Sequence, residues 1–346
     1  MFAQIAMVAV VGVLVGGILI AGISALRPLF DRPPAVPVPT PTKTLEPAAK
    51  PAQLFDGDCE SVLTLEQLQE ITGADMELTS GADITSVGYD GQAKWAVTQS
   101  GGLVCEWRLV DSNSSTDPAV YLAFMRQELL SNFEASTPCL PPYTEFLSCA
   151  IEHETGGLRV SGGITAGDEA STAAAAQSIL DAIDARVAEV PVGESPAPVE
   201  GAWANPTDCA ALLEAMDSKN TLGRELTTSE GLGHGSYWAQ GIADLVQNDQ
   251  STTCMFLDAE PAGAEPVQAG IQGGGSWVAP LVAERAGAKV VTVAGFDYAV
   301  YIETADGMTP QLHAFRGPNW ISTSVLDGDV KAAGKVLRVF ADALDK

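Results

Sequence analysis

Two pairs of cysteines with nearly the same spacing constrain the fold of this chain more than any other feature. Cys59 and Cys105 are 46 residues apart, and Cys209 and Cys254 are 45 residues apart. An aromatic residue stands two positions after the second cysteine of each pair, in the sequences CEWRLV and CMFLDA. A repeat of this length indicates a duplicated structural unit.

A third match extends the repeat toward the C-terminal part of each copy. The sequence AIEHET at 150–155 aligns with AVYIET at 299–304 under the same offset. Coincidence at three separate places is a poor explanation, so we predict two tandem domains, at 54–187 and at 203–346.

Each predicted copy begins with a short helix that carries the first cysteine and ends with an amphipathic helix. Thr207 is a favourable N-cap for the second opening helix, and Gly73 is a typical stop for the first. Closing helices are predicted within 173–187 and 331–344. Alternating sequences between the helices predict strands at 103–110, 147–153, 254–259 and 298–303. The expected fold class is α+β, with two tandem copies of an antiparallel sheet and helices packed on one face of each.

The duplication also predicts how the cysteines pair, although six cysteines alone allow 15 connectivities. The pairs present in both copies are the two described above, and Cys139 and Cys149 then pair by elimination. Paired cysteines persist in oxidising compartments, so both domains are expected outside the cytoplasm.

The first 31 residues predict a transmembrane anchor. The segment from Ile5 to Leu26 holds no charged residue and is long enough, as a helix, to span the roughly 30 Å hydrocarbon core of a bilayer. A cleaved signal peptide is the main alternative, but its apolar run is usually only about 7 to 15 residues. Arg27 and Arg32 follow the helix, and the positive-inside rule alone favours cytoplasmic domains. We take the paired cysteines as a stronger indicator of orientation than the two arginines. We therefore expect a single-pass protein of the cytoplasmic membrane with extracytoplasmic domains.

Two Pro-rich segments separate these parts of the chain. Residues 32–53 alternate proline with small residues, which favours extended polyproline II and predicts a spacer. Residues 188–202 have the same composition and predict the linker between the two domains.

The charge of the chain excludes one class of partner. With 44 acidic and 18 basic residues, the formal net charge is -26. A surface this acidic repels phosphate backbones, so we expect no nucleic-acid partner.

These features resemble the PknH-type sensor domain of actinobacterial receptor kinases and the related actinobacterial family of small secreted lipoproteins of unknown function. The resemblance rests on an early cysteine in DCESVL and TDCAALL, a strand cysteine followed by an aromatic residue in CEW and CMF, and an alanine-rich closing helix. It covers 54–187 and again 203–346. It implies an extracytoplasmic ligand-sensing module of the cell envelope.

The sequence contains no recognisable catalytic motif. A catalytic nucleophile needs an adjacent base, and the three histidines, His153, His234 and His313, stand in no such arrangement. His153 aligns with Ile302 and is expected at the interface between sheet and helix. We therefore expect a protein that is not an enzyme and that holds no cofactor and no metal.

Loop aromatics of the second copy favour binding. Trp238, Trp277 and Trp320 lie in Gly- or Pro-containing segments, and His234 lies in the same Gly-rich segment as Trp238. Such residues supply rigid contact area for sugars or apolar ligands. The alternative is that each tryptophan packs over its own turn.

We expect a membrane-anchored extracytoplasmic binding or sensing module that is non-catalytic. Candidate partners are cell-wall glycan, lipid or another envelope protein. The alternative function is a structural or protein-interaction component of the cell envelope. A pocket lined by the tryptophans favours the first function, and a flat apolar patch favours the second.

Overall fold

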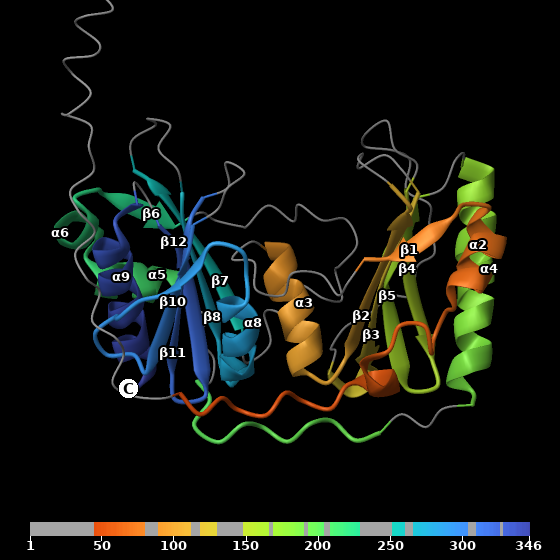
Figure 1. Cartoon of the computed structure of the whole chain (residues 1–346), viewed down its shortest axis with the longest axis horizontal. Helices are drawn as coiled ribbons and strands as arrows, with labels where there is room; N and C mark the ends of the chain where they lie inside the picture. The colour runs from red at the N-terminus through yellow and green to blue at the C-terminus, as the bar shows by residue number, and fades with distance from the viewer. Residues whose placement is uncertain are drawn as a thin grey trace, which may run out of the picture. The chain divides into compact units, whose positions relative to one another are not determined.

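The structure, a computed structural model, describes residues 45–79, 89–111, 118–129, 148–165, 169–189, 193–203, 208–228, 251–259, 266–303, 309–325 and 328–346. These residues form two antiparallel sheets with helices packed against them, which confirms the α+β class (Figure 1). The predicted anchor at 1–31 lies outside the described residues. Within them, no helix has the length and apolar composition that crossing a membrane requires.

The first sheet has five antiparallel strands in the spatial order β1-β2-β3-β5-β4. Its strands are β1 (Met76–Leu78), β2 (Leu103–Leu109), β3 (Ala119–Arg126), β4 (Ser148–Thr155) and β5 (Leu158–Thr165). The helices of this half are α2 (Leu65–Thr72), α3 (Tyr89–Gln99) and α4 (Glu169–Val187), with short 3-10 turns η2 (Leu54–Gly57) and η3 (Gln127–Leu129).

The second sheet has seven antiparallel strands in the order β6-β7-β8-β12-β11-β10-β9. Its strands are β6 (Leu226–Thr228), β7 (Ser251–Asp258), β8 (Val267–Gln272), β9 (Ala288–Val290), β10 (Tyr298–Ile302), β11 (Gln311–Arg316) and β12 (Asn319–Ser324). The helices described in this half are α5 (Cys209–Met216), α6 (Ser218–Leu222), α8 (Ala279–Ala283) and α9 (Val330–Leu344), with a 3-10 turn η4 (Gly275–Val278).

Five strands of the second sheet repeat the order of the first sheet, but one predicted correspondence is wrong. By position in the sheet, β1, β2, β3, β5 and β4 correspond to β6, β7, β8, β12 and β11. The alignment of 150–155 with 299–304 matched β4 with β10, which lies beyond this shared set. A fixed offset fails here because the second half inserts η4, α8, β9 and β10 between β8 and β11. His153 therefore has no counterpart in Ile302.

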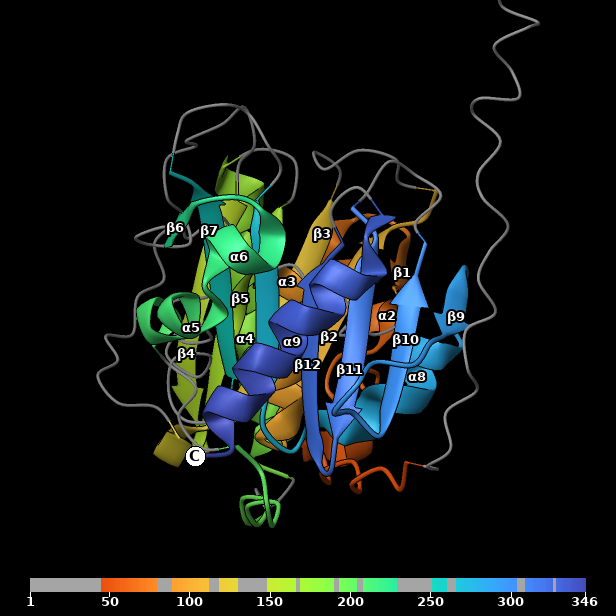
Figure 2. The same ribbon diagram turned by 90° about the vertical axis from the view of Figure 1, so that its left-hand side faces the viewer.

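The closing helices pack against the outer face of each sheet, as their apolar stripes predicted. In the first half, Ile179 and Ile183 of α4 are fully buried against residues of the sheet such as Trp107. In the second half, Leu337 and Phe340 of α9 are buried in the same way, and Figure 2 shows α9 crossing β12 and β11. These two outer cores account for most of the buried apolar side chains in the described part of the chain.

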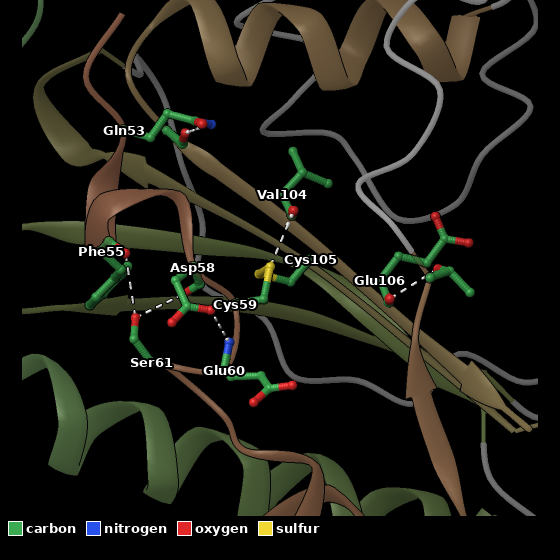
Figure 3. The surroundings of a disulfide bond; sticks show 11 residues. Gln53, Phe55, Asp58, Cys59, Glu60, Ser61, Val104, Cys105 and Glu106 are labelled. Carbon is green, nitrogen blue, oxygen red and sulfur yellow. Dashed lines mark hydrogen bonds between the residues drawn. A yellow bond between two sulfur atoms is a disulfide. The ribbon is translucent and has the colours of Figure 1, made fainter. Parts of the chain in front are cut away.

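Two of the predicted disulfides are confirmed. Cys59 and Cys105 are joined with an S–S distance of 2.05 Å (Figure 3), and Cys209 and Cys254 are joined with a distance of 2.02 Å. Each bond attaches the opening segment of its half to the second strand of the sheet. Cys149 is also disulfide-bonded, but Cys139 lies outside the described residues, so that pairing stays a prediction.

The opening segments differ in detail from the prediction. Cys59 lies in a turn before α2, and the helix itself begins after Thr64, whose side chain and that of Gln67 form a reciprocal capping box. In the second half, the side chain of Asp208 caps α5 by accepting from the backbone N–H groups of Ala210 and Ala211. The predicted cap, Thr207, lies outside the described residues. Gly73 ends α2 as predicted, in the left-handed conformation.

A third core lies on the inner faces of the sheets, so helices are not confined to one face as predicted. The helix α3 contacts β2 and β3 of its own sheet and also β7 of the second sheet. Side chains of both halves enter this core, including Trp95 and Met125 from the first, and Trp277 and Trp320 from the second.

The predicted linker and part of the predicted spacer are bound to the sheets. Arg126 of β3 donates from Nε to the carbonyl oxygen of Gly193 at 2.9 Å, and Asn319 of β12 donates from Nδ2 to the carbonyl oxygen of Gly201 at 3.0 Å. In the spacer, the N–H of Ala48 donates to Oγ of Ser276 at 2.8 Å. The described parts of both segments are therefore attached to the domains rather than extended away from them.

Candidate binding site

Polar side chains occupy the inner face of the second sheet, where a purely structural interface would be apolar. Alternate residues of a strand point to opposite faces. Leu312 and Ala314 of β11 face the outer core, whereas Gln311 and His313 face inward. On β12 the inward side chain next to His313 is Ser322. The inner face therefore carries hydrogen-bonding groups that are shielded from water.

His313 is fully buried and has a partner on each ring nitrogen. Nε1 of Trp320 lies 3.3 Å from Nδ1, and Oε1 of Gln311 lies 3.3 Å from Nε2. Because an indole N–H only donates, Nδ1 accepts and Nε2 carries the proton of a neutral ring. Burial, with a smaller contribution from the nearby charge of Arg285, lowers the pKa of His313 to about 3. This histidine is therefore neutral at physiological pH.

Four other side chains on or against this face hold buried polar atoms that have no hydrogen-bond partner among the described residues. These atoms are Nε1 of Trp95, Oγ1 of Thr253, both amide atoms of Gln272, and Oγ of Ser322. We call these four residues the inner polar cluster. A buried polar atom without a partner costs about 1–3 kcal/mol, and proteins rarely retain one without a functional or structural reason.

The members of the inner polar cluster are close to one another. Thr253 and Ser322 are both paired with Gly270, one on each side of β8, so the three residues share one face of the sheet. Gln272 is two residues along β8 on the same face, at a diagonal spacing of about 7–8 Å from both. Trp95 joins them from α3. A Cβ atom at Gly275 would lie 3.0 Å from Cζ2 of Trp95 and 3.2 Å from Cβ of Gln272.

The triple glycine at 273–275 brings the two halves and the linker together beside this cluster. A Cβ atom at Gly273 would lie 2.3 Å from the carbonyl oxygen of Trp203, the residue that follows the linker. At Gly274, which has φ of +75°, it would lie 2.9 Å from Nε2 of Gln99 in α3. At Gly275 it would reach both Trp95 and Gln272, as described above. Each glycine thus permits a contact that a larger residue would obstruct.

The charged groups next to Trp95 are paired. Nζ of Lys94 lies 3.1 Å from Oε2 of Glu106, and the two side chains are only 12% and 6% exposed. Arg108 contacts the other oxygen of the same carboxylate. These ion pairs leave the inner polar cluster itself without a formal charge.

The structure describes two of the four predicted binding residues. Trp277 lies in η4, 6% exposed, and donates from Nε1 to Oε1 of Gln99 at 2.7 Å. Trp320 lies within β12 rather than in a loop, is fully buried, and packs edge-to-face on Trp95. Both belong to the third core and border the inner polar cluster, and their part in binding stays a prediction. His234 and Trp238 lie outside the described residues.

Sequence reasoning missed Gln272, Thr253, Ser322 and Trp95. The signal present was the alternation of polar residues in strand sequences, as in NWISTS at 319–324, where Ile321 faces a core and Ser322 the opposite side. That pattern normally indicates a solvent-exposed face, so it did not suggest a buried site.

No family model, curated protein or solved structure matches this chain.

The chemistry that this arrangement supports is recognition through hydrogen bonds. Within the described ranges, no group of three or more His, Cys, Asp or Glu side chains is placed to hold a metal ion. His153 pairs with Asp184 of α4 at 2.7 Å on the outer face, away from the cluster. The inner polar cluster therefore offers amide, hydroxyl and indole groups. Together these groups can donate hydrogen bonds to a polar molecule and accept hydrogen bonds from it.

Proposed function

We propose that this chain is a non-catalytic binding or sensing module, anchored in the bacterial cytoplasmic membrane by its N-terminal helix. In this proposal the two domains lie on the extracytoplasmic side, and the inner polar cluster recognises the ligand. The resemblance to PknH-type sensor domains supports the class of function. The paired cysteines support the extracytoplasmic location, because such bonds persist in oxidising compartments.

The proposal depends mainly on the buried side-chain amide of Gln272. Its side chain is fully buried, and neither the amide oxygen nor the amide nitrogen has a partner among the described residues. A bound ligand that forms hydrogen bonds with this amide would remove the free-energy penalty of burying it unpaired in the ligand-free protein. A site that accepts and donates at one side chain is suited to selecting a small polar molecule.

The proposal is tested by native mass spectrometry of the full chain in lipid nanodiscs. The protein is incubated with a muramidase digest of bacterial cell walls and, separately, with polar lipids. We expect the parent to retain a small molecule that Gln272→Met loses. The control is Gln177→Met on the exposed surface of α4, which makes the same chemical change far from the cluster. The same adduct on all three proteins, or none on any, would contradict the proposal.

A second candidate function, protein interaction in the envelope, is favoured by a different surface. Leu281 of α8 is 43% exposed and Val290 of β9 is 47% exposed, and these two elements contact each other. Among the described strands, β9 lies at the edge of the sheet and is bonded to β10 alone. Exposed apolar residues beside an open strand edge are typical of docking surfaces. If Leu281→Asp abolishes binding of an envelope protein and Gln272→Met leaves that binding unchanged, the result would support this function instead.

A further inference from the structure

The inner polar cluster combines donors and acceptors. Gln272 can donate two hydrogens and accept at its oxygen, the hydroxyls of Thr253 and Ser322 can do both, and Trp95 can only donate. A ligand that satisfies this set needs both kinds of group, as hydroxyl-bearing and amide-bearing molecules do.

The four side chains of the cluster carry no formal charge, and among the described residues Arg285 is the one charge that acts on the neighbouring His313. His313, beside Ser322, is uncharged because burial holds its pKa far below its ordinary value. Lys94, beside Trp95, is paired with Glu106. Burying a formal charge without an opposite charge costs several kcal/mol, much more than burying a neutral polar group. An ionised ligand therefore meets no oppositely charged side chain among the four residues of the cluster.

Both halves of the chain contribute to the cluster. Trp95 comes from α3 of the first half, while the other three members come from the second sheet. A Cβ atom at Gly275 would lie 3.0 Å from Trp95 and 3.2 Å from Gln272, so residues of both halves lie next to this glycine. A single copy of the domain would hold only part of this set.

Ordered water is the competing explanation for the buried polar atoms. Buried waters typically make about three hydrogen bonds each and fill polar sites in many proteins. If water alone satisfies Gln272, replacing its amide by an apolar group of similar shape costs stability and affects no binding. A ligand site predicts the opposite combination, since functional polar residues are commonly suboptimal for stability.

We infer that the site between the two halves takes an uncharged small molecule rich in hydroxyl or amide groups, held jointly by Trp95, Thr253, Gln272 and Ser322. This inference rests on the proposed function and specifies its ligand class. It also gives the tandem arrangement a role, because neither half carries the whole set.

The test uses isothermal titration calorimetry on the full chain in nanodiscs with three probes of similar size. The probes are diacetylchitobiose, which is uncharged, its deacetylated form, which is cationic, and the disaccharide cellobiouronic acid, which is anionic. We expect the uncharged probe to bind at least tenfold more tightly than either charged probe. We expect Gln272→Met to weaken that binding at least tenfold, and Gln177→Met to leave it within twofold.

Each contrary outcome has a separate meaning. Tighter binding of a charged probe, lost in Gln272→Met, would overturn the ligand class while the proposed binding function stands. Binding of the uncharged probe that is unchanged in Gln272→Met would remove the cluster from recognition. No binding of any probe, together with no adduct in native mass spectrometry, would overturn both proposals and leave ordered water as the partner of these atoms.

Discussion

Nε1 of Trp277 donates a hydrogen bond to Oε1 of Gln99 at 2.7 Å, although the two residues are 178 positions apart in the chain. Trp277 belongs to the second half and Gln99 to the end of α3 in the first, and both are buried. This bond lies at the triple glycine, next to the inner polar cluster. It connects the two halves directly, in addition to the linker.

Trp277→Phe is expected to destabilise the protein by about 1–3 kcal/mol, because it leaves the buried Oε1 of Gln99 without its donor. Trp203→Phe is the matched control. Its indole N–H donates to Asp345, whose side chain is 46% exposed, so water can replace the lost bond. Denaturant unfolding measures both variants. If both variants lose the same free energy of unfolding, the hydrogen bond from Trp277 to Gln99 stabilises the protein no more than the exposed bond from Trp203 to Asp345.

The glycines of the 273–275 segment should differ in their tolerance of alanine. A Cβ atom at Gly273 meets the backbone of Trp203 at 2.3 Å, while at Gly275 it meets side chains at 3.0 Å or more. Backbone yields less readily than side chains, so Gly273→Ala should cost about 1–3 kcal/mol and Gly275→Ala less. Thermal unfolding of both variants tests this order, and a reversed order would contradict the packing described.

Removing the disulfide between Cys209 and Cys254 should lower the free energy of unfolding by about 2–4 kcal/mol. The reason is that the unfolded chain is no longer restricted by the loop that this bond closes. The change is Cys209→Ser with Cys254→Ser, and the first disulfide provides the comparison. The sequence separations are 45 and 46, so the two double variants should lose similar amounts. Because the third core contains side chains of both halves, we expect one cooperative unfolding transition in each case. Two separate transitions in circular dichroism would contradict this.

The stability of the protein should fall as pH decreases from about 6.5, the ordinary pKa of histidine. His313 resists protonation in the folded state, where its pKa is about 3, while the unfolded chain takes up the proton at its ordinary pKa. One such group contributes a slope of about 1.4 kcal/mol per pH unit within this interval. His313→Gln should reduce the slope between roughly pH 5 and 6.5, where carboxylates contribute little. If the free energy of unfolding depends on pH in the same way in parent and variant, the pKa of His313 is not lowered in the folded protein.

The two duplicated disulfides and the closing helices could be predicted because each rests on a local or duplicated signal. The cysteine spacing is repeated, and the apolar stripe of α9 includes Leu337 and Phe340 at helical spacing. The strand at 298–303 was predicted correctly, but its correspondence with β4 failed because an insertion interrupts the repeat. The linker contacts of Arg126 could not be predicted, since they are made to backbone carbonyls that any sequence would provide.

The candidate site was only partly foreseeable. The tryptophans at 277 and 320 were selected for their Gly- and Pro-containing surroundings, yet they lie in the third core. What surrounds them depends on α3, whose sequence contains no feature that indicates packing against β7. Contacts between distant halves leave no local pattern, so Trp95 and Gln272 could be recognised only in the structure.

The free energy of unfolding of Gln272→Met, measured by denaturant titration on ligand-free protein, shows whether the buried amide of Gln272 lacks a partner. We expect a value equal to that of the parent or higher by up to about 2 kcal/mol, because the variant no longer buries an unpaired amide. Gln177→Met should leave the value unchanged within about 0.5 kcal/mol, as exposed substitutions usually do. A decrease of about 1–3 kcal/mol in Gln272→Met would show that the amide is already satisfied in the ligand-free protein, and would contradict the claim that it awaits a ligand.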